Sequence, residues 1–409
     1  MSNLRARAAE LDAADPLAGY RDRFVGSETE LVYFDGNSLG RPLRATAERL
    51  SAFVAGDWGG RLIRGWDEQW YDAPLALGDE IGRICVGAAP GQVAVGESTT
   101  VWLYKLIYAG VAGQRARDPR RDEIVVAVDD FPTDRYLVEG IAADLGCRVV
   151  WLDAGTTAGV TGELLAPVLG DRTALVVLSH VTYRSGFMAD GPGLTRQIQQ
   201  AGALVLWDFS HSVGSVEVDL DGWGADLAAG CTYKYLNGGP GSPAFGYVAA
   251  RHQGELRQPI QGWMGHANPF LMGPGYHPSD GMRRFLSGTP PITGMLGMRD
   301  MLALIDEVGM PAVRRKSVAL TAFAAELTAA LLPEVEIASP ADPESRGGHI
   351  TLRHPAMQAV NAALWQRDVL PDYRDPGGLR IGLSPLSTSF DELWRGMQAV
   401  REEFARVTG

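Results

Sequence analysis

Short apolar runs alternate with helical patterns through the middle of the chain, and this alternation restricts the fold more than any other feature. The runs lie at 93–95, 123–128, 148–152, 173–179, 203–207 and 226–231. Helical patterns, such as those at 134–145 and 162–169, separate several of them. Strands that alternate with helices form a mostly parallel sheet with both faces covered. The sequence therefore predicts the α/β fold class with one large sheet.

Beyond about residue 290 the pattern changes. Long helical patterns at 294–308 and 312–331 precede short strands at 349–353 and 379–382, a helix at 356–366 between these strands, and a last helix at 390–406. A chain of 409 residues also exceeds one average core. We predict an N-terminal segment (1–50) that joins the small domain, a large domain (51–290) and a small C-terminal α+β domain (291–409).

The N-terminal region has a less regular pattern. Residues 4–23 predict a charged surface helix, and a short strand at 31–34 enters a segment (35–42) dense in turn-forming residues. Residues 57–72 are rich in tryptophan, glycine and charge, which predicts a loop. The tryptophans of this stretch, Trp66 among them, either pack into a core or form a wall of a substrate pocket.

The composition argues against several classes of partner. Lysine and arginine number 37 against 49 acidic residues, and this net charge of −12 disfavours nucleic acid and anionic membranes. No apolar run reaches the roughly 18 residues of a membrane span, and no signal peptide is visible. The three cysteines are scattered and imply no disulfide framework. We therefore expect a cytoplasmic protein.

An acid and a lysine follow two of the apolar runs. Asp208 ends the run at 203–207, and Lys234 follows the run at 226–231. A buried carboxylate and a lysine at neighbouring strand ends are what pyridoxal phosphate (PLP) needs. The amine forms a Schiff base with the aldehyde, and the carboxylate keeps the pyridine nitrogen protonated. An ordinary salt bridge at the strand ends explains the pair, taken alone, equally well.

Hydroxyl groups begin the helix that follows the first strand. Ser98 and Thr99 offer side-chain hydroxyls and free backbone amides, and the positive end of the helix dipole favours an anion such as a phosphate. A helix N-cap alone is the commoner reason for serine and threonine at such a position.

Other polar and aromatic side chains follow further strand ends, where ligands bind in open α/β sheets. Phe131 would stack on a pyridine ring with Asp134 near it, or the two would form only a turn and a capped helix. His211 would orient the Asp208 carboxylate or contact the ring, or be a hydrogen-bonded core residue. Tyr233 would donate to a phosphate or a substrate oxygen, or only pack.

Other kinds of site lack their signatures in this sequence. The seven histidines show no HExxH or other metal-ligand spacing, and no CxxC pair is present. The dinucleotide and P-loop motifs are also missing. We interpret the glycine-rich run at 238–243, which no Lys-Ser or Lys-Thr follows, as a tight turn.

A series of motifs carries a resemblance that covers nearly the whole chain. They are Tyr-Phe-Asp-Gly-Asn-Ser-Leu-Gly at 33–40, Asp-Phe-Pro-Thr-Asp at 130–134, Trp-Asp-Phe-Ser-His-Ser at 207–212, Tyr-Lys-Tyr-Leu-Asn-Gly-Gly-Pro-Gly-Ser-Pro at 233–243, Gly-Trp-Met-Gly-His at 262–266 and Phe-Leu-Ser-Gly-Thr-Pro-Pro at 285–291. With these motifs in this order, the chain resembles the kynureninase family of PLP-dependent hydrolases. The resemblance implies the aspartate aminotransferase fold (fold type I), with a mostly parallel seven-stranded sheet in the large domain.

The resemblance also implies which residues hold the cofactor. Lys234 would bind PLP as a Schiff base, and Asp208 would pair with the pyridinium nitrogen. The other implied contacts are Ser98, Thr99 and Tyr233 at the phosphate, Phe131, Asp134 and His211 at the ring, and Trp263 and Thr289, which would reach the site across a dimer interface. A homodimer with shared active sites follows from the last two.

For the substrate, a small amino acid, the resemblance implies a further set of contacts. Arg380 resembles the arginine that clamps the α-carboxylate, a task that suits a fixed bidentate guanidinium. Asn37 would also contact the substrate. Trp66 and Thr289 resemble the bacterial form of the pocket around the aryl ring, which favours kynurenine over its 3-hydroxy derivative.

The implied reaction is hydrolysis of the Cβ–Cγ bond of L-kynurenine, or of a ring-substituted kynurenine, to anthranilate and L-alanine. Lys234 would move the α-proton, and Tyr233 is the candidate for protonating the β-carbon. Tryptophan catabolism and NAD biosynthesis are the implied context. The alternatives are a class V aminotransferase, a desulfurase-like activity on the same fold, and a non-catalytic PLP-binding dimer.

Two positions depart from the family's pattern. Thr182 stands where the family usually has asparagine in Ser-His-Val-Asn-Tyr, and Trp102 stands where a smaller polar residue is more usual. Both departures leave the cofactor residues intact and bear on the identity of the substrate.

Overall fold

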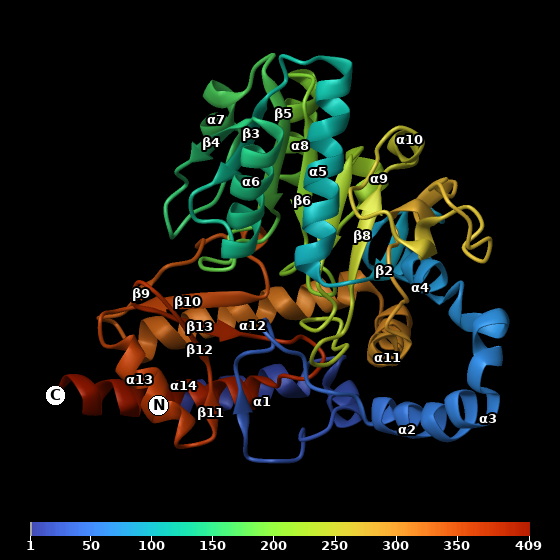
Figure 1. Cartoon of the computed structure of the whole chain (residues 1–409). Coiled ribbons are helices and arrows are strands. Elements are labelled where there is room, and N and C mark those ends of the chain that lie inside the picture. Colours follow the sequence, from blue (N-terminus) through green and yellow to red (C-terminus); the bar gives the residue numbers. More distant parts are fainter. Residues whose placement is uncertain (1) are drawn as a thin grey trace.

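The large sheet of the computed structural model, which describes residues 2–409, has seven strands in the order β2-β8-β7-β6-β5-β3-β4 (Figure 1). The strands are β2 (Val93–Gly96), β3 (Glu123–Ala127), β4 (Arg148–Leu152), β5 (Thr173–Ser179), β6 (Leu204–Asp208), β7 (Leu227–Gly230) and β8 (Ala244–Val248). The five strands from β7 to β4 in this order pair in parallel. The predicted fold class, with a mostly parallel seven-stranded sheet, is confirmed.

The strand pattern in the sequence missed β8. This strand runs antiparallel to both of its neighbours, β7 and β2. It directly follows the glycine- and proline-rich turn at 238–243, and all five of its residues are buried. A short run that is buried on both faces has no period of two, so its pattern alone does not identify a strand.

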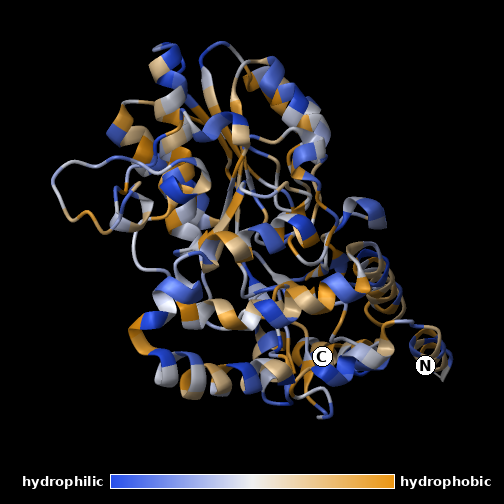
Figure 2. Ribbon diagram, turned by 90° about the vertical axis from the view of Figure 1, so that its right-hand side faces the viewer, coloured by the Kyte–Doolittle hydropathy of each residue, from blue (hydrophilic) through white to orange (hydrophobic). Residues whose placement is uncertain are grey.

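Helices cover both faces of the large sheet, as Figure 1 shows. On one face, α5 and α6 bring Trp102, Leu106 and Val138 into a core with the strands. On the other face, α4, α8 and α11 contribute to a second core. These helices are α4 (Ala73–Ile81), α5 (Thr99–Arg117), α6 (Pro132–Leu145), α8 (Gly191–Gln200) and α11 (Ile292–Val308). Figure 2 shows hydrophobic strands inside and hydrophilic positions along the outer helices, as burial of apolar surface requires.

The C-terminal part forms a second, smaller sheet with its own core. The strand order is β12-β13-β10-β9, and each pairing is antiparallel. Side chains such as Phe323, Ile350 and Val400 form the core between this sheet and three helices. The elements are α12 (Met310–Leu331), β9 (Glu336–Ile337), β10 (His349–Arg353), α13 (Met357–Trp365), β12 (Asp372–Arg374), β13 (Gly378–Gly382) and α14 (Phe390–Thr408).

The N-terminal segment packs beside these C-terminal elements. α1 (Ser2–Ala13) lies along α14, and β1 (Val32–Tyr33) pairs in parallel with β11 (Val369–Leu370) (Figure 1). The predicted single helix at 4–23 is wrong, because α1 ends before Pro16 and a separate 3-10 helix follows at Ala18–Arg23. The limits of the three predicted domains stay a prediction.

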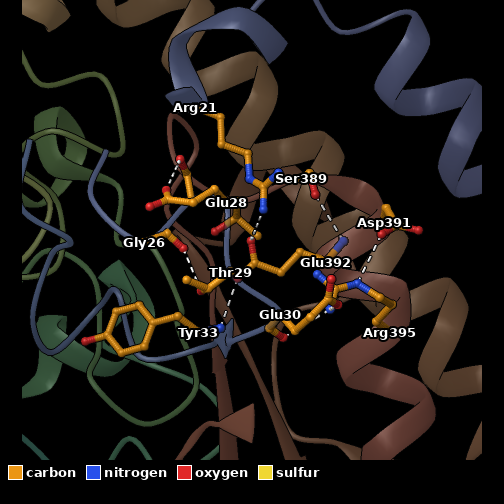
Figure 3. A network of polar contacts seen from close by, with 12 residues as sticks. Arg21, Gly26, Glu28, Thr29, Glu30, Tyr33, Ser389, Asp391, Glu392 and Arg395 are labelled. Carbon is orange, nitrogen blue, oxygen red and sulfur yellow. Dashed lines mark hydrogen bonds and ion pairs between the residues drawn. The ribbon is translucent and has the colours of Figure 1, made fainter. Parts of the chain in front are cut away.

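A buried ion network fastens this N-terminal segment to α14 (Figure 3). The Glu392 carboxylate is fully buried and accepts hydrogen bonds from the Tyr33 backbone N–H at 3.0 Å and from Arg41 at 2.8 Å. Arg21 lies 3.7 Å from its second oxygen. The Ser389 hydroxyl caps α14 by accepting from the Glu392 backbone N–H at 3.0 Å. Burial raises the pKa of Glu392, and Arg41 opposes this shift.

The tryptophan-rich segment is an irregular helix, so the prediction of a loop at 57–72 is wrong. After α2 (Arg44–Phe53) come a π-helical turn (Val54–Trp58), α3 (Gly59–Arg61), a 3-10 turn (Leu62–Arg64) and a second π-helical turn (Trp66–Trp70). The sequence shows no apolar face of period 3.6 here, because most of these side chains are exposed. Contacts among aromatic rings, such as that between Phe53 and Trp70 at 5.9 Å, support the segment instead.

Candidate active site

The carboxyl ends of β5, β6 and β7 bring the predicted catalytic groups to one edge of the large sheet. Asp208 is the last residue of β6 and lies opposite Ser179, the last residue of β5. Lys234 follows the end of β7 after a short turn and is close enough to Asp208 to favour its charged form. Because parallel strands end together, side chains that follow neighbouring strands gather at one place. The acid and the lysine therefore share a site.

Asp208 is a buried carboxylate held by its own loop. One oxygen, Oδ1, accepts from the Ser210 backbone N–H at 2.8 Å and from the Ser210 hydroxyl at 2.6 Å. Burial raises the pKa of Asp208, while the bonds from Ser210 and the charge of Lys234 oppose the shift. Two donors on one oxygen fix the direction of the carboxylate, so its other oxygen has a defined place for a partner.

His211 contacts the lysine directly. Its Nε2 lies 3.0 Å from the Lys234 amine, and its Nδ1 has no partner among the described residues. Burial, with Lys234 and Arg380 next, holds the pKa of His211 well below its usual value. The imidazole is therefore neutral at physiological pH, and its Nε2 can accept a hydrogen bond from the amine.

Two further carboxyl groups are buried beside Asp208. Neither oxygen of Asp134 finds a hydrogen-bond partner within residues 2–409. Burial, and then the charges of Asp208 and Asp130, raise the pKa of Asp134 well above its usual value. Burial, and less so Asp208, raises the pKa of Asp130 to about 7. Asp130, Asp134 and Asp208 are therefore a cluster of buried acids, which suits a cationic or N–H-bearing group.

The start of α5 is a helix N-terminus at the end of β2. The Ser98 hydroxyl accepts from the Val101 backbone N–H at 3.3 Å, so the N-cap interpretation holds for this residue. Its own O–H remains available to donate, as do the unpaired amides of the first helical turn. Glu97, just before it, has a φ of 54°, a left-handed conformation that is costly for this residue type and recurs at functional sites.

These groups together fit PLP. The amine of Lys234 suits an aldehyde, the buried carboxylates suit a protonated pyridine nitrogen, and the N-terminus of α5 suits a phosphate. The unpartnered oxygens of Asp134 are the most direct sign, because a buried carboxyl without a partner is unfavourable unless a ligand supplies one.

Arg380 is buried at the joint between the large and small sheets. Its Nη1 donates to the Tyr183 backbone carbonyl at 2.8 Å, and its Nη2 donates to the Ser38 hydroxyl at 2.9 Å. It also forms an ion pair with Asp372 on β12. These three contacts fix the plane of the guanidinium, as a carboxylate clamp requires.

Asn37 and Phe131 lie beside the contacts of Arg380. Asn37 is fully buried, and its amide has no partner among the described residues. Gly382 on β13 leaves room for it, because a Cβ there would lie 1.9 Å from the Asn37 oxygen. The Phe131 ring is 41% exposed and meets the Tyr183 ring edge-on at 5.5 Å.

Tyr233 and Lys234 sit on a loop that the N-terminal segment crosses closely. The Tyr233 carbonyl accepts from the Gly40 N–H at 2.8 Å, and a Cβ at Gly40 would lie 2.3 Å from the Lys234 carbonyl. Only glycine fits there. Burial, and then Cys231, raise the pKa of Tyr233, so the phenol keeps its proton at neutral pH.

The remaining predicted residues are Trp66, Trp263 and Thr289. Trp66 packs edge-on against Trp70 at 5.7 Å, in the irregular helix. Trp263 is 39% exposed and packs against Phe270 at 6.1 Å, and Thr289 is exposed. Their predicted roles depend on a second subunit or on the substrate and stay predictions.

The two departures from the family's pattern have structural roles. Trp102 is fully buried, donates from Nε1 to the Gly96 carbonyl at 2.7 Å and fills the space left by Gly246 on β8. Thr182 closes a tight turn, where its hydroxyl meets that of Ser185 at 2.6 Å and accepts from the Phe187 N–H at 3.1 Å.

Several residues around the site escaped the sequence analysis. Asp130 lay inside a quoted motif, and its position at a strand end was the available signal. Ser210 likewise lay in the motif around Asp208. Tyr183 ended the segment that resembles the family's Ser-His-Val-Asn-Tyr pattern, whereas His349 and Asp372 come from distant parts of the chain and no local pattern marks them.

Comparison with known proteins finds relatives that match nearly the whole chain. Residues 313–400 match the family model of the kynureninase C-terminal domain. A curated relative named kynureninase, from Burkholderia pseudomallei, is 41% identical over 401 residues, which cover 97% of this chain and 95% of the relative. One of the same name from Pseudomonas fluorescens is 41% identical over 404 residues, with the same coverage.

Solved structures with the same fold are more distant in sequence. A cysteine desulfurase from Thermococcus onnurineus has a TM-score of 0.79 and 18% identity, over 93% of this chain and 96% of its own. A mutant of C-DES with glycine covalently linked to the PLP cofactor has a TM-score of 0.81 and 18% identity, over 93% and 99%. At this level of identity they establish the fold.

The fold, together with the relatives at 41% identity, defines a PLP-dependent enzyme of fold type I. The amine, the buried acids and the helix N-terminus occupy the strand ends where such a cofactor binds. Within that class, the chain belongs to the kynureninase family.

Proposed function

We propose that the protein hydrolyses the Cβ–Cγ bond of L-kynurenine, or of a ring-substituted kynurenine, to anthranilate and L-alanine. The observation that carries the proposal is the joint presence of the Lys234–His211 contact at 3.0 Å and the buried, fixed guanidinium of Arg380. The first prepares an amine for a cofactor aldehyde. The second provides a place for an amino-acid carboxylate at the same sheet edge.

The side chains divide the task of holding the cofactor. Lys234 would link to PLP covalently, Asp208 would keep the ring nitrogen protonated, and Phe131 would pack on the ring. Ser98, Thr99 and Tyr233 would hold the phosphate. When bound, PLP supplies an electron sink for negative charge that develops next to the amino-acid α-carbon.

The side chains of the protein then position the substrate and move protons. Arg380 holds the α-carboxylate, and Asn37 contacts the substrate near it. The Lys234 amine takes the α-proton, and the neutral ring of His211 accepts a hydrogen bond from that amine. Tyr233, which keeps its proton at neutral pH, donates to the β-carbon after water has added to the γ-ketone and the Cβ–Cγ bond has broken. One water is consumed for each anthranilate and alanine formed.

We propose a homodimer in which Trp263 and Thr289 complete the site of the other subunit. Support comes from the exposure of apolar side chains near Trp263: Phe270, Leu271 and Met272 are 60%, 60% and 79% exposed. Such a patch marks an interaction surface. Trp66 and Thr289 would then border the aryl ring of the substrate. Light scattering should give twice the mass of one chain.

We place the reaction in the cytoplasm, in tryptophan catabolism and NAD biosynthesis. The three cysteines are all free, as is usual in a reducing compartment, and this supports the location. Among residues 2–409, no helix has both the length and the apolar character needed to cross a membrane.

The alternative activities make different demands on the chain. A desulfurase needs a mobile catalytic cysteine in the C-terminal part, and no cysteine follows Cys231, which is itself buried. A non-catalytic PLP-binding dimer has no need for a carboxylate clamp, the role proposed for Arg380. A class V aminotransferase would use the same cofactor residues. Its products, a keto acid and pyridoxamine phosphate, distinguish it from a hydrolase.

One assay tests the proposal. Purified protein with PLP and L-kynurenine should release fluorescent anthranilate and an equal amount of alanine. Formation of a keto acid together with pyridoxamine phosphate would favour transamination, and no anthranilate from any kynurenine would reject the hydrolase.

A lysine variant tests the cofactor anchor separately. Lys234→Ala should lose the visible absorption band of the lysine-bound cofactor and all hydrolysis. Lys316→Ala is the matched control, because Lys316 is a buried lysine paired with Asp15 in the N-terminal region. This variant should keep the band. Persistence of the band in Lys234→Ala would show that another group holds PLP.

A further inference from the structure

His349 is a buried imidazole that the proposed mechanism does not use. It is fully buried on β10, and neither ring nitrogen has a partner among the described residues. Its ring lies 5.6 Å from the ring of His211, at an angle of 55°. Burial, and then Arg380, hold the pKa of His349 at about 3, so the ring carries no charge at neutral pH.

The strand pair β10–β13 presents His349 together with the carboxylate clamp. Thr351 pairs with Arg380 across the two strands, and His349 pairs with Gly382. Alternate residues of a strand share a face, so His349, Thr351 and Arg380 point the same way. Gly382 has no side chain, and the ring of His349 therefore has no neighbour directly opposite on this face.

All three side chains on this face contact one turn of the large domain. Arg380 donates to the Tyr183 carbonyl at 2.8 Å, and the Thr351 hydroxyl donates to the Arg184 carbonyl. Gly186, with a φ of +70°, lies against His349, since a Cβ there would meet its Nε2 at 3.3 Å and its carbonyl oxygen at 2.8 Å. The turn therefore fixes Arg380 and the His349 ring relative to each other.

The contacts of His211 show why its ring needs a neighbouring group to orient it. Its Nε2 meets Lys234 at 3.0 Å, but its Nδ1 makes no hydrogen bond to the described residues that would orient the ring. The orientation of His211 therefore rests on packing, and the His349 ring is the aromatic group packed against it. The charged groups that face His211 are Lys234, Arg380 and Arg374.

We propose that His349 is a positioning residue, which holds the ring of His211 against the Lys234 amine and ties that ring to the strand pair carrying Arg380. It acts through His211 and touches no reacting atom. A shift of the β10–β13 pair when Arg380 binds a carboxylate would then be transmitted to the amine. This inference rests on the proposed roles of Lys234 and Arg380.

The test compares two neighbouring residues of β10 in the PLP-loaded enzyme. His349→Ala removes the ring that faces His211. Ile350→Ala is the matched control, because Ile350 is equally buried but belongs to the core on the opposite face. The measurements are the pH titration of the visible band of the lysine-bound cofactor, the PLP dissociation constant, and kcat and KM for L-kynurenine.

We expect His349→Ala to move the midpoint of the spectral titration and to lower kcat about tenfold, with KM raised less. His349→Phe, which keeps a ring, should recover part of both effects. Ile350→Ala should lower the temperature of unfolding and leave the spectral titration unchanged.

Other outcomes overturn the inference in distinguishable ways. Equal spectral shifts in His349→Ala and Ile350→Ala would mean that loosening of the small domain is the cause. A wild-type titration and kcat in His349→Ala would remove His349 from the site. If Lys234→Ala also kept its band, the anchor itself would be wrong, and the fault would lie with the proposed function instead.

Discussion

Asp130 shows how a single buried carboxyl makes stability depend on pH. Burial, with Asp208 next, raises its pKa to about 7, while an aspartate in an unfolded chain has a pKa of about 4. Between these values the unfolded chain has lost the proton that the folded protein keeps. The unfolded state then binds fewer protons, so the free energy of unfolding falls as the pH rises. The loss is complete above pH 7, with an upper limit of about 4 kcal/mol.

Replacing this acid should therefore stabilise the protein at alkaline pH. We expect cofactor-free Asp130→Asn to unfold at a higher temperature than the natural protein at pH 8 and at a similar temperature near pH 4. Circular dichroism during heating measures both. Asp122→Asn is the control with the opposite sign, because the hydrogen bond from Arg172 lowers the pKa of Asp122. A difference that does not change between pH 4 and pH 8 would contradict the assignment.

At the scale of one element, α5 would be both a helix and, through the role proposed for Ser98, a binding site for the PLP phosphate. The Ser98 hydroxyl accepts from the Val101 N–H at 3.3 Å and still has its own proton to donate. Ser98→Ala should reduce the free energy of unfolding by about 1 kcal/mol through loss of the cap. It should also weaken PLP binding by roughly tenfold or more, because a hydrogen bond to a charged phosphate is lost.

An N-cap away from the site separates these two effects. Thr161 caps α7 (Gly162–Leu165) by accepting from the Leu164 N–H, also at 3.3 Å. Thr161→Ala should lose similar stability with unchanged affinity for PLP, measured by fluorescence titration. Equal loss of affinity in both variants would mean that Ser98 acts only through general stability.

Some helices and strands were predicted well from the sequence, and others were not. The positions of β5 and β6 followed from pattern alone, because these strands match the apolar runs at 173–179 and 203–207. β8 and the irregular helix at 54–70 did not. β8 is buried on both faces, and the irregular helix is held by contacts between aromatic rings, so neither leaves a periodic trace.

For the whole molecule, the Glu392 network decides whether the N-terminal segment stays in place. Arg41→Met would leave the buried Glu392 carboxylate without its nearest cation, which costs about 3 kcal/mol. Arg395→Met is the control within the same network (Figure 3), because Arg395 pairs with the exposed Glu30 and should cost less than about 1 kcal/mol. The midpoint of urea unfolding measures both.

A double variant shows whether the loss comes from the unpaired charge. Arg41→Met combined with Glu392→Met should be more stable than Arg41→Met alone, because no buried carboxylate is then left without a partner. A double variant that is less stable than the single one would mean that the carboxylate keeps adequate partners without Arg41.

Local sequence patterns predict only part of the candidate site. Asp208 ends β6, and Lys234 lies in the loop after the neighbouring strand β7, so the two could be paired from the sequence. The contacts of Arg380 with Tyr183 and Ser38 join three distant parts of the chain. Ser38 and Tyr183 lie in motifs of the family's pattern, but only the tertiary fold shows that both contact Arg380.

The separation of these parts along the chain has a consequence for biosynthesis. Three residues proposed to hold PLP come from one stretch of the chain, 98–234: Ser98, Asp208 and Lys234. Arg380 lies on β13, near the end of the chain. A chain leaving the ribosome therefore exposes this stretch long before Arg380, the residue proposed to bind the substrate carboxylate. We expect newly made molecules to pass through a stage at which they take up PLP and do not yet retain an amino acid.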